Sequence, residues 1–338
     1  MRKRASLWLL LSAGLAAGGV RLQTAGFPLW AYGYITAPAA PGDYSATCLG
    51  ERPLDCDRAG GLPTDPQNTI RRLPGGEGAF TVAQISYRYG PADWFPGDHP
   101  PMPDIVARGK EAIGLRACPL CHLPNGKGLM QNGGVAGLPV EYFTQQIADF
   151  KNGRRKSADL NKANAFEMAA IARNLTDAEA RTAAEYFGSI KFTPWVRVVE
   201  SETVPTFTAT INGLFLKADG NDTEPLGQRL VELPENTYET NILRNPRSGF
   251  VVYAPAGSLE RGETLSKGCG ACHGADLRGA KNVPPIAGRS SSYLGRKLYD
   301  MQQGTRNGDQ AKLMKPAVQK LTENDLIAIA AYVSSLQP

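Results

Sequence analysis

Cys118-Pro-Leu-Cys-His122 and Cys269-Gly-Ala-Cys-His273 are the two stretches of sequence that decide the fold. In each, two cysteines are separated by two residues, and a histidine follows the second cysteine directly. The two motifs take up four of the 6 cysteines and two of the 3 histidines in this chain of 338 residues. Most of the sulfur and imidazole chemistry of the chain therefore lies in one repeated pentapeptide.

The two motifs belong to a longer internal repeat, whose offset is the 151 residues from Cys118 to Cys269. The pairs that keep this offset are Gly128 and Gly279, Ala136-Gly137 and Ala287-Gly288, Tyr142 and Tyr293, Gly153 and Gly304, and Arg155 and Arg306. After one loop the offset becomes 146, and it is kept by Met168 and Met314, Leu175-Thr176 and Leu321-Thr322, and Tyr186 and Tyr332. The sequence therefore predicts two copies of one domain.

Cys-x-x-Cys-His is the signature of covalent haem attachment. The two thiols reach the two vinyl groups of one porphyrin, and the histidine faces the iron as an axial ligand. The alternatives are a zinc site, which needs further Cys or His ligands nearby, and a redox-active thiol pair, which needs a βαβ context. We therefore expect two covalently attached haem c groups, bound by Cys118, Cys121 and His122 and by Cys269, Cys272 and His273.

A second axial ligand for each iron is predicted from the repeat. A methionine thioether is a soft, neutral ligand of haem iron. Met168 and Met314 occupy matched positions, whereas Met130 aligns with Lys281 and Met301 aligns with Phe150. A ligand common to both copies should lie at matched positions, so we predict His122 and Met168 at one iron and His273 and Met314 at the other.

The composition excludes several classes of protein. Hydrophobic residues make up 42% and charged residues 20%, which is ordinary for a globular protein. The net charge of +5 is small and no basic stripe with aromatic residues is present, so nucleic-acid binding is not expected. The body of the chain has no apolar stretch of about 20 residues, which excludes a polytopic membrane protein.

The N-terminus has the pattern of a targeting segment. Met1 to Arg4 is basic, and Ala5 to Val20 is uncharged and rich in Leu, Ala and Gly, as in a secretory signal peptide. We therefore expect export to the periplasm. The alternative is an uncleaved anchor that associates with the membrane, because the chain stays uncharged from Leu22 to Gly42 and contains aromatic residues there.

The predicted organisation is a signal peptide or anchor (1–20), an irregular extension (21–102), a helical domain (103–195), an acidic connector with strands (196–255) and a second helical domain (256–338). Within the connector we expect strands at 196–199, 206–211 and 250–253. Helices are expected over 105–113 and over 259–266, the second capped by Ser258, and 80–87 is expected to be a strand or a short helix. Capping boxes are predicted at Thr176 and Thr322. The fold class is mostly α.

Gly109 and Gly262 fall within the first predicted helix of each domain. A glycine there permits another helix to approach closely. We expect Gly109 to face Tyr186 or Phe187, and Gly262 to face Tyr332.

The order of motif, Gly-rich loop, Ala-Gly, Tyr-containing helix, Gly-x-Arg, Met and Leu-Thr helix resembles class I cytochrome c. Two such domains in tandem resemble the diheme c4-type cytochromes, and also the haem subunits of membrane-bound dehydrogenases. In this family a proline carbonyl often accepts a hydrogen bond from the haem-ligating histidine. Pro284 matches that proline, whereas Gly133 stands in its place in the first copy, so the resemblance implies this contact only for the second.

The resemblance implies a periplasmic carrier that passes single electrons from a dehydrogenase or respiratory complex to an acceptor, with no catalytic residues. The alternatives are a diheme enzyme, peroxidase-like or oxidising sulfur compounds, and a permanent haem subunit of a dehydrogenase or oxidase complex. Cys48, Cys56 and His99 remain outside the repeat. In an oxidising compartment the two cysteines are expected to form a disulfide. His99 is expected to be structural, although a Cys or His of the extension as an unusual iron ligand would favour an enzyme.

Overall fold

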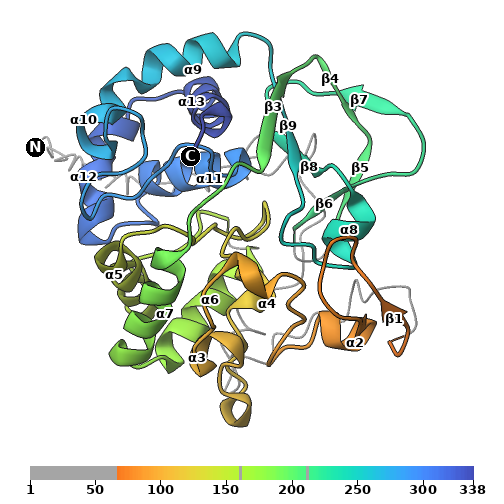
Figure 1. The fold of residues 1–338 in the computed structure, drawn as a ribbon. Coiled ribbons are helices and arrows are strands. Elements are labelled where there is room, and N and C mark those ends of the chain that lie inside the picture. The colour runs from red at the N-terminus through yellow and green to blue at the C-terminus, as the bar shows by residue number, and fades with distance from the viewer. Residues whose placement is uncertain (1–66, 160–161, 211–212) are drawn as a thin grey trace, which may run out of the picture.

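The computed structural model of the protein describes residues 67–159, 162–210 and 213–338, and Figure 1 shows its ribbon. Two groups of helices carry the two motifs, and a connector made mostly of short strands lies beside both of them. This is the mostly α fold with a strand-containing connector that the sequence predicts. The targeting segment 1–20, Cys48 and Cys56 lie outside the described residues.

The described part of the extension is short and irregular. Its elements are β1 (Ile70–Arg71), β2 (Phe80–Thr81), α2 (Val82–Ile85) and the 3-10 turn η2 (Pro96–Asp98). The stretch 80–87, expected as a strand or a short helix, contains both. Thr81 and Gln84 form a capping box, so α2 starts directly after β2. Trp94 is buried there and donates a hydrogen bond from Nε1 to Leu243 O of the connector at 2.7 Å.

The first helical group surrounds the first motif. Its elements are α3 (Asp104–Ala107), η3 (Glu111–Ile113), α4 (Pro119–His122), α5 (Val140–Lys151), α6 (Ala163–Asn174) and α7 (Asp177–Ser189). The predicted helix over 105–113 is wrong, because the chain turns at Gly109, which has φ +67°. A Cβ at Gly109 would lie 2.2 Å from Leu115 O, so this glycine permits a tight turn and does not face Tyr186 or Phe187.

The connector contains a three-stranded sheet and two small antiparallel pairs. Its elements are β3 (Val196–Glu200), β4 (Thr203–Pro205), β5 (Phe207–Ala209), β6 (Phe215–Lys217), β7 (Thr223–Pro225), β8 (Val231–Pro234), α8 (Thr237–Asn241) and β9 (Phe250–Ala254). In the larger sheet the order is β3-β9-β8, with β3 parallel and β8 antiparallel to β9. The strands expected at 196–199 and 250–253 are confirmed, and the one expected at 206–211 is the shorter β5.

The second helical group surrounds the second motif. Its elements are α9 (Ser258–Ser266), η4 (Lys267–Cys269), α10 (Gly270–His273), α11 (Ser291–Gln302), α12 (Asp309–Val318) and α13 (Glu323–Ser335). The expected crossing at Gly262 is confirmed, because a Cβ there would lie 2.1 Å from Ala328 O and 2.6 Å from Tyr332 Cβ of α13. The predicted cap is wrong: Gly257, with φ +78°, precedes α9, and Ser258 is the first helical residue.

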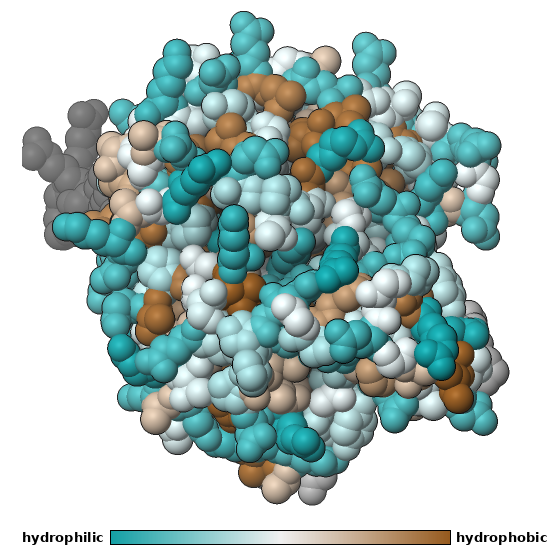
Figure 2. All heavy atoms as spheres, in the orientation of Figure 1, coloured by the Kyte–Doolittle hydropathy of each residue, from teal (hydrophilic) through white to brown (hydrophobic). Residues whose placement is uncertain are grey.

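The last helix of each group begins with the same capping box, and each group shares a hydrophobic cluster with the connector. The capping boxes at Thr176 and Thr322 both form and start α7 and α13. One cluster of buried residues contains Phe187 of α7 together with Phe250 of the connector, and another contains Val252 of the connector together with Leu326 of α13. The connector therefore packs against both helical groups. On the face in Figure 2, hydrophilic side chains cover most of the surface.

Candidate functional site

The two motifs adopt the same local structure. Cys118 precedes the one-turn helix α4 and Cys269 precedes the one-turn helix α10, so that each histidine ends a helical turn that begins at its first cysteine. The chain then turns through a positive φ, 62° at Leu123 and 84° at Gly274. In the first copy this conformation is held by a leucine, for which it is unfavourable. The same geometry at both places indicates that it serves the site.

The two histidines are oriented in the same way. His122 Nδ1 donates a hydrogen bond to Gly133 O at 2.8 Å, and His273 Nδ1 donates one to Pro284 O at 2.9 Å. Such a bond fixes the ring and leaves Nε2 free to bind a metal. The resemblance implied this contact only for the second copy. It is present in both because the acceptor is a backbone carbonyl, which glycine supplies as well as proline.

The cysteines do not have the properties of a redox-active thiol pair. Burial raises the pKa of the Cys118 thiol to about 12 and that of the Cys121 thiol to about 11. Burial also raises the pKa of Cys269. A redox-active pair requires a lowered thiol pKa, usually next to a cation or a helix N-terminus. The alternative of a thiol–disulfide site is therefore disfavoured.

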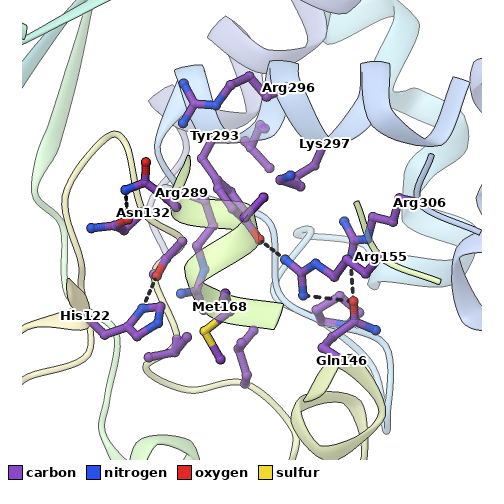
Figure 3. A pocket seen from close by; sticks show the side chains of 18 of the residues that line it. His122, Asn132, Gln146, Arg155, Met168, Arg289, Tyr293, Arg296, Lys297 and Arg306 are labelled. Atoms are coloured by element: carbon purple, nitrogen blue, oxygen red, sulfur yellow. Dashed lines mark hydrogen bonds between the residues drawn. The ribbon is translucent and has the colours of Figure 1, made fainter. Parts of the chain in front are cut away.

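One cavity joins the two motifs. It contains about 1940 Å³ of empty space, part of it open to solvent, and its lining includes Cys118, His122, Cys269 and His273. Among the methionines that the structure describes, Met168 and Met314 are the two that line it. Figure 3 shows His122 and Met168 reaching into this space from α4 and α6. The predicted iron ligands of both copies thus border one interior space.

Two other methionines and the third histidine do not line this cavity. Met130 and Met301 are buried in hydrophobic clusters of the first and second helical group, 1% and 7% exposed. His99 lies in the extension, where its Nε2 is 3.1 Å from the Asp93 carboxylate and its Nδ1 donates to Pro100 O at 2.9 Å. Its ring packs edge-on against Tyr186. His99 is therefore a structural residue, as expected.

Arginine and tyrosine side chains cross between the copies on one side of the cavity. Arg155 donates to Tyr293 Oη at 2.9 Å, and Arg306 donates to Tyr142 Oη at 2.7 Å. Both guanidinium groups also donate to Gln146 Oε1, at 3.0 and 2.9 Å. Figure 3 shows Arg155 between Tyr293 and Gln146, with Arg306 also directed at Gln146. All four residues belong to the repeat, but the sequence does not predict that each arginine bonds to the tyrosine of the other copy. That pairing depends on how the two copies pack.

Two arginines in or next to α11 line this cavity. Arg289 donates to Ala136 O at 2.8 Å and Arg296 to Met130 O at 2.5 Å, so both reach into the first helical group. Burial lowers the pKa of Arg289 to about 10. Burial alone would raise the pKa of the Tyr293 phenol, but the nearby cations, Arg155 first among them, lower it to about 8. The cavity is thus electrostatically suited to anionic groups.

The residues that line the cavity fit a haem c group. Several buried guanidinium nitrogens have no hydrogen-bond partner among the described atoms, namely Nε of Arg155, Nε and Nη1 of Arg289 and Nε of Arg306. Buried cationic donors require an anionic partner, and a haem carries two carboxylate side chains. The apolar remainder of the lining, which includes Ile147, Ile171 and Leu294, suits the body of a porphyrin. The site therefore offers thiols, imidazoles, thioethers and cations together.

None of the helices within residues 67–159, 162–210 and 213–338 is both long and apolar enough to span a membrane.

Comparison with known proteins agrees with this site. The family model "Cytochrome c" matches residues 259–337. Cytochrome c-554(548) of Halomonas halodenitrificans is 40% identical over 81 residues, which are 24% of this chain and 98% of that protein. A thiosulfate dehydrogenase electron acceptor of Stutzerimonas stutzeri is 26% identical over 235 residues, 69% of this chain and 84% of that protein. Cytochrome c4 of Pseudomonas aeruginosa is 23% identical over 235 residues, 68% of this chain and 90% of that protein.

The match to the Halomonas cytochrome covers nearly the whole of that protein, and the two longer matches each cover about two thirds of this chain. With its two Cys-x-x-Cys-His repeats the chain is similar to the diheme cytochromes c4, which are electron carriers, and it belongs to the cytochrome c family, whose members attach haem c covalently.

Proposed function

We propose that this protein is an exported electron carrier with two covalently bound haem c groups, which passes single electrons from a dehydrogenase to an acceptor. The observation that carries the proposal is the single cavity, because His122, Met168, His273 and Met314 all line it. Domains 103–195 and 256–338 each supply one half of the site.

Each residue type has a separate role in this proposal. The thiols of Cys118 and Cys121, and of Cys269 and Cys272, would hold the porphyrins as thioethers. His122 and His273 would bind the irons through Nε2, because their Nδ1 atoms are engaged with backbone carbonyls. Met168 and Met314 would supply thioether ligands, which raise the reduction potential of a haem iron. The bound haem supplies one-electron chemistry at its iron.

A closed iron distinguishes a carrier from an enzyme. If histidine and methionine both bind, no coordination position is open to a substrate. In support of this, a histidine and a methionine of each copy line the cavity, whereas His99 does not. This supports the carrier over a peroxidase-like or sulfur-oxidising enzyme.

The name of one relative suggests the class of donor. The Stutzerimonas protein, matched over 84% of its length, is called a thiosulfate dehydrogenase electron acceptor. We propose that the donor here is likewise a dehydrogenase of a reduced sulfur compound, bound either transiently or as a permanent partner. Export by the segment 1–20 would place this exchange in the periplasm, with that segment cleaved or kept as an anchor.

The ligand assignment is tested on the purified haem protein. A pyridine haemochrome assay should give two haems per chain. The weak near-infrared charge-transfer band of ferric His–Met haem should lose about half of its intensity in Met168→Ala and in Met314→Ala. Met301→Leu, which alters a buried methionine of the core, is the matched control and should keep the full band. An unchanged band in both alanine variants would disprove the assignment.

A further inference from the structure

The loops that follow the two motifs differ sharply in exposure. Residues 123–130, after the first motif, are all buried. At the matched positions 274–281, after the second motif, five residues are exposed, including Asp276, Arg278 and Lys281. Three matched pairs in these loops share a positive φ, namely Leu123 and Gly274, Gly126 and Leu277, and Gly128 and Gly279. Because the turns are alike there, we attribute the difference in exposure to what packs against each loop.

The connector and the extension cover the first motif. Arg244 donates to Leu120 O, inside the motif, and Asn125 Nδ2 donates to Pro246 O at 2.6 Å. Leu243, next to Arg244, accepts the hydrogen bond from Trp94 of the extension. Both segments are absent from the repeat itself. The first site therefore faces protein where the second faces solvent.

The second motif has an exposed apolar centre. Ala271 and Cys272 within it are exposed. Leu313, next to Met314, is 80% exposed, the highest value among the large hydrophobic residues of the described chain. In Figure 1, α10 and α12, which carry these residues, lie on the same side of the molecule. Met314 and the motif also border the same cavity.

The first copy closes the corresponding surface with an ion pair. The counterpart of Leu313 is Glu167, and that of Lys267 is Arg116. Arg116 Nη1 lies 3.5 Å from Glu167 Oε1, with side chains only 13% and 19% exposed. In the second copy Lys267 and Leu313 are both exposed, so this closure is lost.

The surroundings of this apolar centre are basic. Within residues 267–320, the exposed cations are Lys267, Arg278, Lys281, Lys312 and Lys320, and the exposed acids are Asp276 and Asp309. An apolar patch with a charged rim is typical of a protein interface, and the excess of positive charge attracts an acidic partner and speeds its approach.

We infer that the docking surface, defined as Lys267, Ala271, Cys272, Lys312 and Leu313, binds an acidic redox protein, and that electrons enter and leave this protein through the second site. The inference rests on the proposed carrier function and adds to it the site of exchange and the charge of the partner. One electron passes between the partner's redox group and the second site, and no bond is formed or broken. The first site exchanges electrons only with the second.

The test uses the full-length haem protein and reduced cytochrome b5, a small acidic haem protein, as the probe. Stopped-flow absorbance gives the second-order rate of electron transfer at low and at high ionic strength. The docking variant is Lys267→Glu with Lys312→Glu. The control is Arg173→Glu with Lys191→Glu, which changes the net charge equally at exposed positions of the first helical group.

At low ionic strength the docking variant should slow the reaction by about tenfold or more, because it reverses charge where the partner approaches. The control should slow it by less than about threefold, and high salt should remove both effects. Equal slowing by the two variants, or none in either, would overturn the inference.

Carbodiimide cross-linking between the two proteins gives a second readout. Peptide mapping should find the probe joined to Lys267, Lys281 or Lys312. Cross-links at Lys191 or Lys151, or links from Lys267 and Lys312 to acidic residues within 1–66 of the same chain, would contradict the docking surface. The carrier function is judged separately: both variants should keep the near-infrared band and take up two electrons from dithionite, and loss of that behaviour in the wild type would count against the carrier itself.

Discussion

The first and second motifs have the same skeleton and different surroundings. In both, a cysteine precedes a one-turn helix and the histidine donates a hydrogen bond to a backbone carbonyl. A methionine of the same copy lines the cavity. Around the first motif, however, the connector contributes Arg244 and Pro246 as cover, whereas around the second Cys272 is exposed. The repeat thus sets the local structure of each motif, whereas segments outside the repeat determine how much of each motif is exposed.

The largest expected effect concerns the thiols. Cys118→Ala with Cys121→Ala, and Cys269→Ala with Cys272→Ala, should each lower the covalent haem content from two groups to one, because a thioether needs its own thiol. Intact-mass spectrometry and the haemochrome assay measure this. If either double variant lost both haems, the two sites would not be independent, and the comparison between them would fail.

The next effect concerns the cover of the first motif. Arg244→Ala removes the donor to Leu120 O and should lower the free energy of unfolding by about 1–3 kcal/mol, as expected for a lost charged hydrogen bond. Hydrogen exchange in residues 120–127 should become faster. Arg278→Ala, beside the second motif, removes an exposed side chain and should change stability by less than about 0.5 kcal/mol. Equal effects of the two substitutions would show that the cover of the first motif is not a stabilising feature.

A smaller effect should be the same in both copies. Thr176 and Thr322 both accept a hydrogen bond at the start of the last helix of their group, in the same capping box. Replacing either by alanine should lower the free energy of unfolding by about 1 kcal/mol. Urea denaturation of the two variants side by side checks this. A cost confined to one copy would mean that the repeat does not extend to the energetics of these helices.

The smallest effect is a pH dependence that comes from His99 of the extension, whose ring packs against Tyr186 of the first copy. Burial opposes the charge on His99, but its hydrogen bond to Asp93 and the Pro100 carbonyl outweigh burial, so the pKa of His99 is raised. The charged form is therefore favoured in the folded state. Its contribution is complete below the unfolded pKa of about 6.5 and is lost as the pH rises through the higher folded value.

His99→Gln should remove this dependence. Relative to the variant, the wild type should be more stable at acidic pH by less than about 1 kcal/mol, since the Asp93 side chain stays 20% exposed and water screens the pair. The advantage should disappear at alkaline pH. Urea midpoints across this range measure it, and a wild-type advantage that grew with pH would have the wrong sign.

Much of the fold and of the site follows from sequence, for physical reasons. The motif spacing is set by the two vinyl groups of one porphyrin, and the capping boxes are local hydrogen-bond patterns, so both are visible in short stretches. Matching the repeats selected Met168 and Met314 over Met130 and Met301, and the structure places the first two at the cavity and the others in the core. Their binding to iron stays a prediction.

Other features depend on contacts between distant residues. Arg244 and Leu120 are 124 positions apart, and nothing in either sequence stretch indicates their contact. The exchange of Arg155 and Arg306 between copies likewise depends on how the two groups pack. The helix expected over 105–113 is interrupted, because α3 ends at Ala107 and Gly109, with its positive φ, turns the chain. Gly262 in the first helix of the second copy lies inside α9, so a glycine in this segment does not by itself predict a turn.

The parallel pairing of β3 with β9 has a consequence for how the chain is assembled. Val196 lies beside Phe250 and Glu200 lies beside Ala254, so the strand that enters the connector and the strand that leaves it end at the same point. A direct peptide link from Glu200 to Pro255 would bypass residues 201–254 and still join the two helical groups. Removing them would leave the backbone of each helical group intact, but it would uncover the first motif and take Phe250 and Val252 out of the cores that the connector shares with the two groups.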